Sequence, residues 1–307
     1  MKQSIGEASG KIIVMGEHAV VYDAYAIAFP FFATKTQVIL KEGDNTLNSI
    51  LYHGKFEQAP DHLHGFIALL DEMKNRYNDE RKYHVNINST IPQQRGMGSS
   101  AAIANALIDA YVDYHEISMS EQEKFELSMF AETINHGKPS GIDSLTTKSN
   151  VPIYFKKGPV VESIKINLSG YLIVADSQIK GQTIEAVTHV ASIMDLESTK
   201  NAIDELNTLS KLSKHAIEHD QLQVLGDYMN RAHILLDELG VSHPTVNTMV
   251  KLATSAGAYG AKMTGGGKGG VMIAVAPSDY HTRNIIQVLK SHGFNNTWVL
   301  NLKEAFQ

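Results

Sequence analysis

Hydrophobic and polar positions alternate in short runs along the N-terminal part of the chain. The clearest pattern covers residues 83–88, where Tyr83, Val85 and Ile87 alternate with polar side chains at the period of a half-exposed strand. Continuous apolar stretches predict further strands, at residues 11–15, 26–33 and 37–41. We therefore expect a β-sheet in this part of the chain.

Helical periodicity follows these strands. Apolar residues recur at helical spacing, which predicts helices over residues 59–76, 100–115 and 120–134. Ser120 and Glu123 begin the last of these segments at the spacing of a capping box, in which each side chain accepts a hydrogen bond from the other residue's backbone N–H. The predicted sheet is thus accompanied by a group of helices.

The C-terminal part of the chain has its own group of elements. Strands are predicted at residues 151–155 and 171–175, and a helical region interrupted near Gly240 and Pro244 covers residues 183–256. The remaining patterns predict strand, strand, helix and strand, over residues 261–264, 270–276, 278–291 and 297–302. This order indicates a split βαβ unit. Because strands and helices are grouped rather than strictly alternating, we predict an α+β fold with two domains, at residues 1–170 and 171–307.

Composition narrows the class of protein. A chain of 307 residues, 43% of them hydrophobic, is long enough for two lobes around a cleft. The net charge of −6 and the dispersed Lys and Arg argue against nucleic acid as a partner. The chain has no cysteine, which excludes disulfides and thiolate metal sites and favours a cytoplasmic location. We expect no signal peptide and no membrane association, since no apolar stretch approaches the ~20 residues of a membrane helix.

The segment PQQRGMGSSAA, residues 92–102, leads from a turn into a predicted helix. Gly96 and Gly98 allow the backbone to approach a phosphate group, and the helix N-terminus adds partial positive charge there. Ser99 and Ser100 add hydroxyl groups. The segment lacks the Lys-Ser or Lys-Thr end of a Walker A loop and the spacing of a dinucleotide-binding loop. It is either a phosphate-binding loop of another kind or an ordinary turn with a serine N-cap.

The segment GKIIVMGEHAVVY, residues 10–22, places ionisable side chains at both ends of a predicted strand. Lys11 lies at its start, and Glu17 and His18 follow the glycine turn at its end. This arrangement suits the binding of a small polar substrate. The alternative is a strand flanked by solvated charges.

Glu132 lies on the apolar stripe of its predicted helix, because it follows Phe125 and Met129 at helical spacing. A carboxylate is rarely buried without a partner. Mg²⁺ would be one suitable partner, since it binds carboxylate oxygens and bridges to substrate phosphates. A buried salt bridge is the alternative.

Asp143 ends the segment HGKPSGID, residues 136–143, in which a turn can direct a carboxylate into a cleft. Phosphoryl transfer needs a carboxylate that accepts the proton of the attacking hydroxyl group, and Asp143 fits this role. Lys11 beside it would favour the ionised form. The alternative is an Asp that caps a helix.

The segment KMTGGGKGG, residues 262–270, is rich in glycine and lies between two apolar runs. So many glycines favour a second loop whose backbone closely approaches a ligand. A flexible hairpin turn is the alternative, although such a turn needs only one or two glycines.

These four segments, in this order, resemble the superfamily of galactokinase, homoserine kinase, mevalonate kinase and phosphomevalonate kinase. GEHAVVY and the E-x-x-x-HGKPSGID block are most similar to the mevalonate kinase branch. The resemblance runs from residue 10 to residue 270. It implies a ribosomal-S5-like N-terminal domain and a ferredoxin-like C-terminal domain around a central cleft. It also implies transfer of the γ-phosphoryl group of ATP to the C5 hydroxyl of mevalonate, which gives 5-phosphomevalonate for isoprenoid precursor synthesis.

The resemblance further implies a role for each matched residue. Asp143 would be the catalytic base and Lys11 its partner, while Ser100 and Glu132 would hold Mg²⁺. The residues implied to contact mevalonate are Glu17, His18 and Thr183. The residues implied to bind ATP are Pro92, Arg95, Gly96, Met97, Gly98, Ser99, Ser100 and Ala101.

Two other functions are compatible with the same motifs. A sister kinase could act on phosphomevalonate, homoserine or a sugar, although galactokinases usually follow Gly-Glu-His with Thr-Asp. A non-catalytic sensor of ATP and a metabolite could lose its base and keep its fold. The presence of Asp143, Lys11, Glu132 and Ser100 together favours the enzyme. The expected partners are ATP and mevalonate, with a homodimer as the expected assembly if the chain associates.

Overall fold

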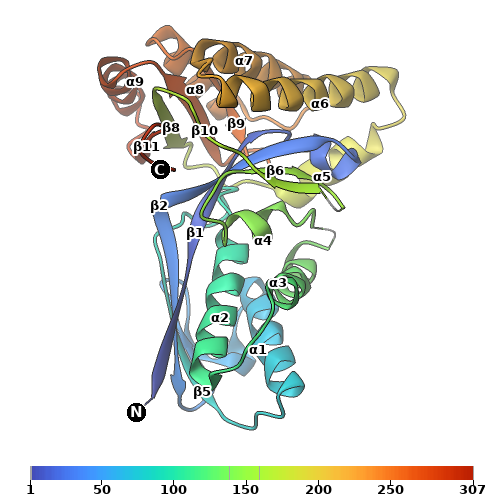
Figure 1. Cartoon of the computed structure of the whole chain (residues 1–307), viewed down its shortest axis with the longest axis vertical. Helices are drawn as coiled ribbons and strands as arrows, with labels where there is room; N and C mark the ends of the chain where they lie inside the picture. The colour runs from blue at the N-terminus through green and yellow to red at the C-terminus, as the bar shows by residue number, and fades with distance from the viewer. Residues whose placement is uncertain (1, 138, 159, 307) are drawn as a thin grey trace. The chain divides into compact units, whose positions relative to one another are not determined.

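The structure of the chain is a computed structural model that describes residues 2–137, 139–158 and 160–306 (Figure 1). Its Cα atoms form two compact units made of interleaved segments. The first unit comprises Met1–Lys11, Pro30–Pro92 and Gly98–Lys148. The second unit comprises Ile12–Phe29, Gln93–Met97 and Ser149–Gln307. The contiguous domains proposed from the sequence, with a boundary at residue 170, stay a prediction.

Strands β1 (Gln3–Met15) and β2 (Tyr25–Glu42) contribute residues to both units. Each is longer than the apolar pattern predicted. Residues 3–10 bury small side chains such as Ser4 and Ala8, so they lack the hydrophobic alternation of an ordinary strand. The two predicted strands at 26–33 and 37–41 are one strand, because the β-branched Thr34 and Thr36 continue it as buried residues.

The first unit pairs residues 36–42 of β2 with β5 (Tyr83–Ser89), and β5 also pairs with a short strand β3 (Thr46–Asn48). Strand β4 (His53–Lys55) completes this part of the sheet and, like β3, was not predicted. The helices of this unit are α1 (His64–Arg76), α2 (Ser99–His115), α3 (Glu121–His136) and α4 (Ile142–Thr146). The capping box of Ser120 and Glu123 is confirmed. Helices α1, α2 and α3 pack on one another (Figure 1).

Helix α1 begins later than predicted. Short 3₁₀ turns occupy Phe56–Gln58 and Asp61–Leu63, and Pro60 lies between them in an extended conformation. Proline disfavours helical backbone in the residue before it, so a helix cannot run through from residue 59. The predicted start of this helix was therefore wrong by several residues.

The second unit contains a four-stranded antiparallel sheet in the order β11-β8-β10-β9. Its strands are β8 (Tyr171–Asp176), β9 (Gly260–Thr264), β10 (Val271–Ala276) and β11 (Thr297–Asn301). Strand β8 lies between β10 and β11, which a helix at residues 279–291 connects, so the predicted split βαβ unit is confirmed. The unit also contains β6 (Ile153–Lys156), which pairs with β2, and β7 (Val160–Ser163), which was not predicted.

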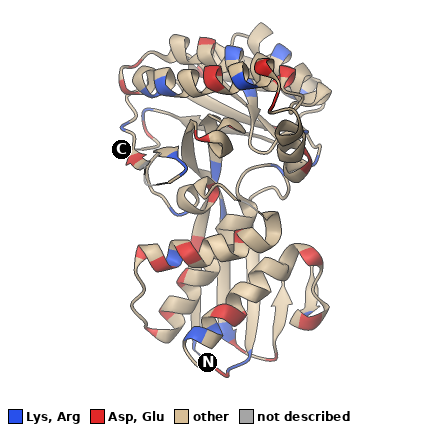
Figure 2. Ribbon diagram, turned by 90° about the vertical axis from the view of Figure 1, so that its right-hand side faces the viewer, with Lys and Arg blue, Asp and Glu red and all other residues tan. Residues whose placement is uncertain are grey.

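The helical region at residues 183–256 consists of separate helices. They are α5 (Thr183–Ser192), α6 (Glu197–Glu218), α7 (Leu222–Glu238) and α8 (Pro244–Ser255). Helices α7 and α8 pack on β9, and α9 (Asp279–Ser291) packs on β8 and β10. Figure 2 shows Lys and Arg interspersed with Asp and Glu on the helices. Among the residues that the structure describes, no helix combines the length and the hydropathy needed to cross a bilayer.

Candidate active site

Helix α2 begins directly after the second glycine of the segment PQQRGMGSSAA. Gly98 is its N-cap at a φ of 75°, and no side chain of the described residues caps the helix. A Cβ atom at Gly98 would lie 2.7 Å from Cγ of Lys11 and 2.9 Å from Cγ2 of Thr147. Both conformation and space therefore require glycine here. The alternative of a serine N-cap was wrong, and the backbone N–H groups of the first turn remain available for an anion.

Lys11 and Asp143 form an ion pair in the first unit. Lys11 Nζ lies 2.9 Å from Asp143 Oδ1. The lysine side chain is 2% exposed and the aspartate side chain 34% exposed, so the carboxylate can be reached from solvent while the ammonium cannot. Asp143 lies in the first turn of α4, whose N-cap is Gly141 at a φ of 94°. The interpretation of Asp143 as a capping residue was therefore wrong.

Glu132 and Ser100 are in contact between α3 and α2. The Ser100 hydroxyl donates to Glu132 Oε1 over 2.5 Å and accepts from the Asn135 side-chain amide over 2.8 Å. Glu132 is 4% exposed, as its position on an apolar stripe predicted. His136 Nε2 lies 3.8 Å from the second carboxylate oxygen, so a salt bridge forms when that imidazole is protonated.

Burial raises the pKa of Glu132, and the nearby Asp143 carboxylate raises it further. His136, the hydroxyl of Ser100 and the ammonium of Lys11 act in the opposite direction and compensate only in part. A divalent cation would supply the missing positive charge, and Mg²⁺ prefers carboxylate and hydroxyl oxygens. The residues present thus fit Mg²⁺. No group of three or more His, Cys, Asp and Glu side chains in the described part of the chain could hold a metal by itself.

Hydrogen bonds hold the loop of residues 93–97 to other residues of the second unit. Arg95 Nε donates to Asp176 Oδ1 over 2.8 Å, and the Gln94 carbonyl accepts from the backbone N–H of Gly181 over 2.7 Å. A Cβ atom at Gly96 would lie 3.0 Å from Cα of Gly265 in the third glycine-rich segment. Sequence reasoning did not identify Asp176 as the partner of Arg95. The predicted contact of Arg95 with ATP stays a prediction.

Glu17 and Lys262 form a buried ion pair in the second unit. The Lys262 ammonium donates to Glu17 Oε1, and it donates to the Met263 carbonyl over 2.7 Å. Both side chains are 0% exposed. Burial lowers the pKa of Lys262, and the Glu17 carboxylate offsets part of this shift. The alternative of solvated charges around this strand was therefore wrong.

His18 lies beside this pair in a strained backbone conformation, with φ 60° and ψ −44°. Such a conformation costs a residue other than glycine about 1–3 kcal/mol. Burial and then the Lys262 ammonium lower the pKa of His18 to about 4, so its imidazole is neutral at pH 7. The predicted contacts of Glu17 and His18 with the substrate stay predictions.

Thr183 is the first residue of α5 and lies against the third glycine-rich segment. A Cβ atom at Gly266 would lie 1.8 Å from Thr183 Oγ1, so no larger residue fits at position 266. The sequence predicted that the backbone of this segment packs closely, but it did not predict which residue packs against it. Lys262, at the start of the segment, is the residue that sequence reasoning left without a role. The one feature that could have pointed to a role for Lys262 is that a charged residue lies within the buried strand β9.

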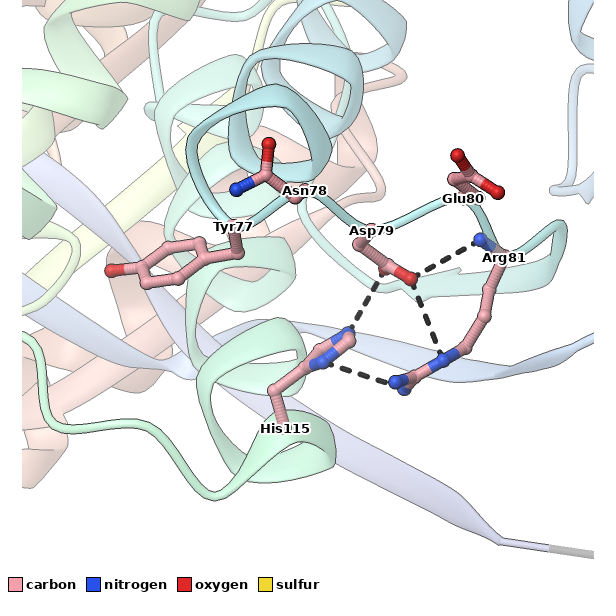
Figure 3. Close-up of a pocket in the computed structure, with 6 residues that line it drawn as sticks. All are labelled: Tyr77, Asn78, Asp79, Glu80, Arg81 and His115. Carbon is pink, nitrogen blue, oxygen red and sulfur yellow. Dashed lines mark hydrogen bonds and ion pairs between the residues drawn. The ribbon is translucent and has the colours of Figure 1, made fainter.

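A hollow of about 430 Å³ lies in the first unit at the C-terminal end of α2 (Figure 3). It is lined by Tyr77, Asn78, Asp79, Glu80, Arg81 and His115. The Asp79 side chain is 3% exposed and accepts hydrogen bonds from the Tyr83 and Tyr111 hydroxyls and from the Arg81 backbone N–H. His115 Nε2 lies 3.2 Å from Asp79 Oδ2. The hollow contains none of the predicted site residues and is separated from Ser99 by about 24 Å of helix.

Asp79 is expected to stabilise the first unit in a pH-dependent way. Burial alone would raise its pKa, but hydrogen bonds from Tyr83 and Arg81 and the charge of His115 lower it below the ordinary value of 3.8. A carboxyl group with a lowered pKa stabilises the fold above its unfolded pKa of about 3.9 and loses this effect as the pH falls towards the folded pKa. We expect Asp79→Asn to lower the free energy of unfolding by about 2 kcal/mol at pH 7.

Urea denaturation at a series of pH values measures this effect. The difference between Asp79→Asn and the wild type is expected to shrink below about pH 4. Glu80→Gln is the matched control, because Glu80 is the exposed neighbour, and it is expected to change stability by less than about 0.5 kcal/mol. A loss that stays constant down to pH 3 would contradict a role for the Asp79 charge.

Comparison with known sequences identifies relatives over most of the chain. The model of the GHMP kinases N terminal domain matches residues 64–148, and that of the GHMP kinases C terminal domain matches residues 213–295. The mevalonate kinase of Aeropyrum pernix is 31% identical over 298 residues, which cover 92% of each chain. The mevalonate kinase of Pyrococcus horikoshii is 30% identical over 323 residues, which cover 95% of this chain and 94% of the relative.

Solved structures have the same fold. The mevalonate kinase from methicillin-resistant Staphylococcus aureus MRSA252 has a TM-score of 0.72 and 32% identity, and the match covers 99% of this chain and 100% of that one. The L. major mevalonate kinase in complex with R-mevalonate has a TM-score of 0.82 at 23% identity, over 98% and 96% of the two chains. The second comparison shows the fold alone.

Proposed function

The chain belongs to the mevalonate kinase family of GHMP kinases, and we propose that it transfers the γ-phosphoryl group of ATP to the C5 hydroxyl of mevalonate. The products are ADP and 5-phosphomevalonate. The observation that carries this proposal is the pair of Lys11 and Asp143, in which a solvent-accessible carboxylate is held by a buried ammonium at 2.9 Å. That pair lies in the same unit as the uncapped N-terminus of α2.

Asp143 is proposed as the catalytic base. The C5 oxygen of mevalonate forms a bond to the γ-phosphorus of ATP, while the bond from that phosphorus to the β–γ bridging oxygen breaks. The hydroxyl proton moves to the Asp143 carboxylate, and the electron pair of the broken bond remains on ADP. Phosphoryl transfer depends mainly on position and charge, which is consistent with so small a set of reacting side chains.

Lys11 is proposed to orient the base and to stabilise negative charge at the attacking oxygen. Its aliphatic stem is confined beside Gly98, so the ammonium has little freedom to move. Because the Lys11 side chain is shielded from water, its attraction for a negative oxygen is stronger than that of a surface lysine.

Ser100 and Glu132 are proposed to hold Mg²⁺. When bound, the ion neutralises phosphate charge and aligns the phosphates for transfer. The partly uncompensated charge of the buried Glu132 supports this role. Backbone N–H groups at Ser99 and Ser100 are proposed to bind the phosphates as well.

Glu132→Gln is expected to raise the Mg²⁺ concentration for half-maximal activity by about tenfold or more, because it removes the charge of a proposed ligand. Activity is measured as a function of free Mg²⁺, and the melting temperature is measured in parallel. Glu126→Gln is the matched control on the exposed side of the same helix. If Glu132→Gln lowers only the melting temperature, Glu132 is a structural ion-pair partner.

The proposed activity is tested by a coupled ADP-release assay with Mg-ATP. Mevalonate, phosphomevalonate, homoserine and galactose are assayed in parallel, and the phosphorylated product is identified by mass. Turnover with mevalonate alone supports the proposal. Turnover with another substrate would assign the chain to a sister activity, and ATP binding without turnover would favour a sensor. A cytoplasmic location and a homodimer stay predictions.

A further inference from the structure

The ion pair of Glu17 and Lys262 is a buried charged feature that the proposed phosphoryl transfer does not use. The Lys262 ammonium has two acceptors, Glu17 Oε1 and the Met263 carbonyl. Because the removal of two charges from water can cost more free energy than their attraction returns, a buried ion pair is a poor source of stability.

Two buried polar atoms beside the pair have no hydrogen-bond partner among the described residues. They are Glu17 Oε2 and His18 Nε2. In the tautomer that carries its proton on Nδ1, the neutral ring of His18 has a free lone pair on Nε2. Neighbouring acceptors without donors are complementary to a ligand that brings hydroxyl groups.

The turn that presents these acceptors is held in an uncommon conformation. Gly16 has a φ of 92°, and a Cβ atom there would lie 2.3 Å from the Tyr25 carbonyl oxygen. His18 follows at a positive φ, and its side chain does not cap the 3₁₀ helix of residues 19–22. A strained turn of this kind persists only where its surroundings determine it.

Strand β9 supplies those surroundings. Lys262 holds the side chain of Glu17, and two residues along β9 the hydroxyl of Thr264 exchanges hydrogen bonds with the backbone of Ile13. The bond that Thr264 donates to the Ile13 carbonyl is 2.7 Å long. One strand thus positions both the end of β1 and the turn that follows it.

Among the described residues, the other titratable groups that interact with Lys262 are two histidines kept neutral. His233 of α7 accepts from the Met263 backbone N–H, and burial followed by the Lys262 ammonium lowers the pKa of His233 to about 4. Asp237 of α7 acts on His233 in the opposite direction. Lys262 therefore faces one carboxylate, Glu17, and two neutral imidazoles, His18 and His233.

We propose that Lys262 is a positioning residue of the substrate site, whose ammonium orients Glu17 so that Glu17 Oε2 and His18 Nε2 accept hydrogen bonds from hydroxyl groups of the substrate. Lys262 acts through Glu17 and does not itself contact the substrate. This inference rests on the proposed function, since the hydroxyl-bearing substrate is that of the proposed reaction.

The kinetic test compares the KM for mevalonate with the KM for ATP. Lys262→Met is expected to raise KM for mevalonate by about tenfold or more and to leave KM for ATP within about twofold of the wild type. Lys262→Arg, which keeps the charge, is expected to recover part of the loss. Lys251→Met is the matched control on the exposed side of α8, with both constants unchanged. A wild-type KM for mevalonate in Lys262→Met, or an equal rise of both constants, overturns the proposal.

A titration of His18 shows whether the Lys262 ammonium acts on the turn that carries Glu17 and His18. The ring protons are followed by NMR and assigned by comparison with His18→Gln. Lys262→Met is expected to raise the pKa of His18 above about 4, because burial, the larger cause of the low pKa, remains while the neighbouring positive charge is removed. An unchanged pKa overturns the proposal. The titration needs no mevalonate, so it tests Lys262 even if the wild type phosphorylates another substrate and the proposed function fails.

Lys262→Met leaves the Glu17 charge buried without a partner and can therefore prevent folding. In that case Glu17→Gln is compared with the double variant Glu17→Gln/Lys262→Met. Neither variant contains the carboxylate charge, and the double variant has no unpaired charge at this place. The same KM for mevalonate in both variants supports the proposal, because Lys262 then acts through Glu17, and a further rise of this KM in the double variant overturns it.

Discussion

Asp143→Asn is expected to lower kcat by about 10²–10⁴-fold while ATP still binds. The substitution keeps the size of the side chain but removes the group that is proposed to take the proton of the C5 hydroxyl. ADP release measures kcat, and equilibrium binding measures the Kd of ATP. Binding is expected to persist because the carboxylate acts on the attacking hydroxyl and not on the nucleotide.

Asp113→Asn is the matched control for this experiment. Asp113 is an exposed aspartate on α2 in the same unit, and its replacement is expected to leave kcat within about twofold of the wild type. If Asp143→Asn also turns over at that rate, Asp143 is not the base. A parallel loss of ATP binding would indicate instead that the substitution disturbs the turn around Gly141.

Lys11→Met is expected to lower kcat by about 10²–10³-fold, the usual cost of removing a preorganised electrostatic group from an active site. Methionine retains most of the aliphatic stem that lies beside Gly98, so the main change is the loss of the ammonium at 2.9 Å from Asp143. The same assays of ADP release and ATP binding apply. Lys35→Met removes a lysine whose side chain is 61% exposed and serves as the control.

The double variant Lys11→Met/Asp143→Asn tests whether the two residues act as a unit. If Lys11 works through the base, the combined loss in kcat is expected to be close to that of Asp143→Asn alone. Additive losses would show that Lys11 acts independently, for example directly on the phosphate.

The local elements could be predicted where one physical signal dominates. The Ser120–Glu123 capping box and the alternation at Tyr83–Ile87 depend on neighbours in sequence, and both agree with the structure. Residues 3–10 were missed as strand because their buried positions hold small residues. A Cβ atom at Gly6 would lie 1.9 Å from the Ala106 carbonyl oxygen, so close packing on α2 and not hydrophobicity dictates the residue there.

For the predicted site residues, local sequence patterns predicted burial but not the contacts between distant residues. The burial of Glu132 followed from its apolar stripe, whereas its contact with Ser100 joins two helices. The ion pair of Glu17 with Lys262 connects positions that are 245 residues apart in sequence. No local pattern encodes such a pair, because its energy depends on burial and on charges that only folding brings together.

By itself, the sequence determined the α+β class, the glycine turns, the split βαβ unit and the residue types available for phosphoryl transfer. These properties depend on backbone conformation and on spacing along the chain, which the residues carry locally. The pairing of Asp143 with Lys11 was expected from the family resemblance, whereas only the tertiary structure decided that Gly98 caps α2 and that Lys262 is neutralised by Glu17. Those outcomes depend on which side chains are removed from water together, since desolvation and Coulomb attraction act through space and not along the chain.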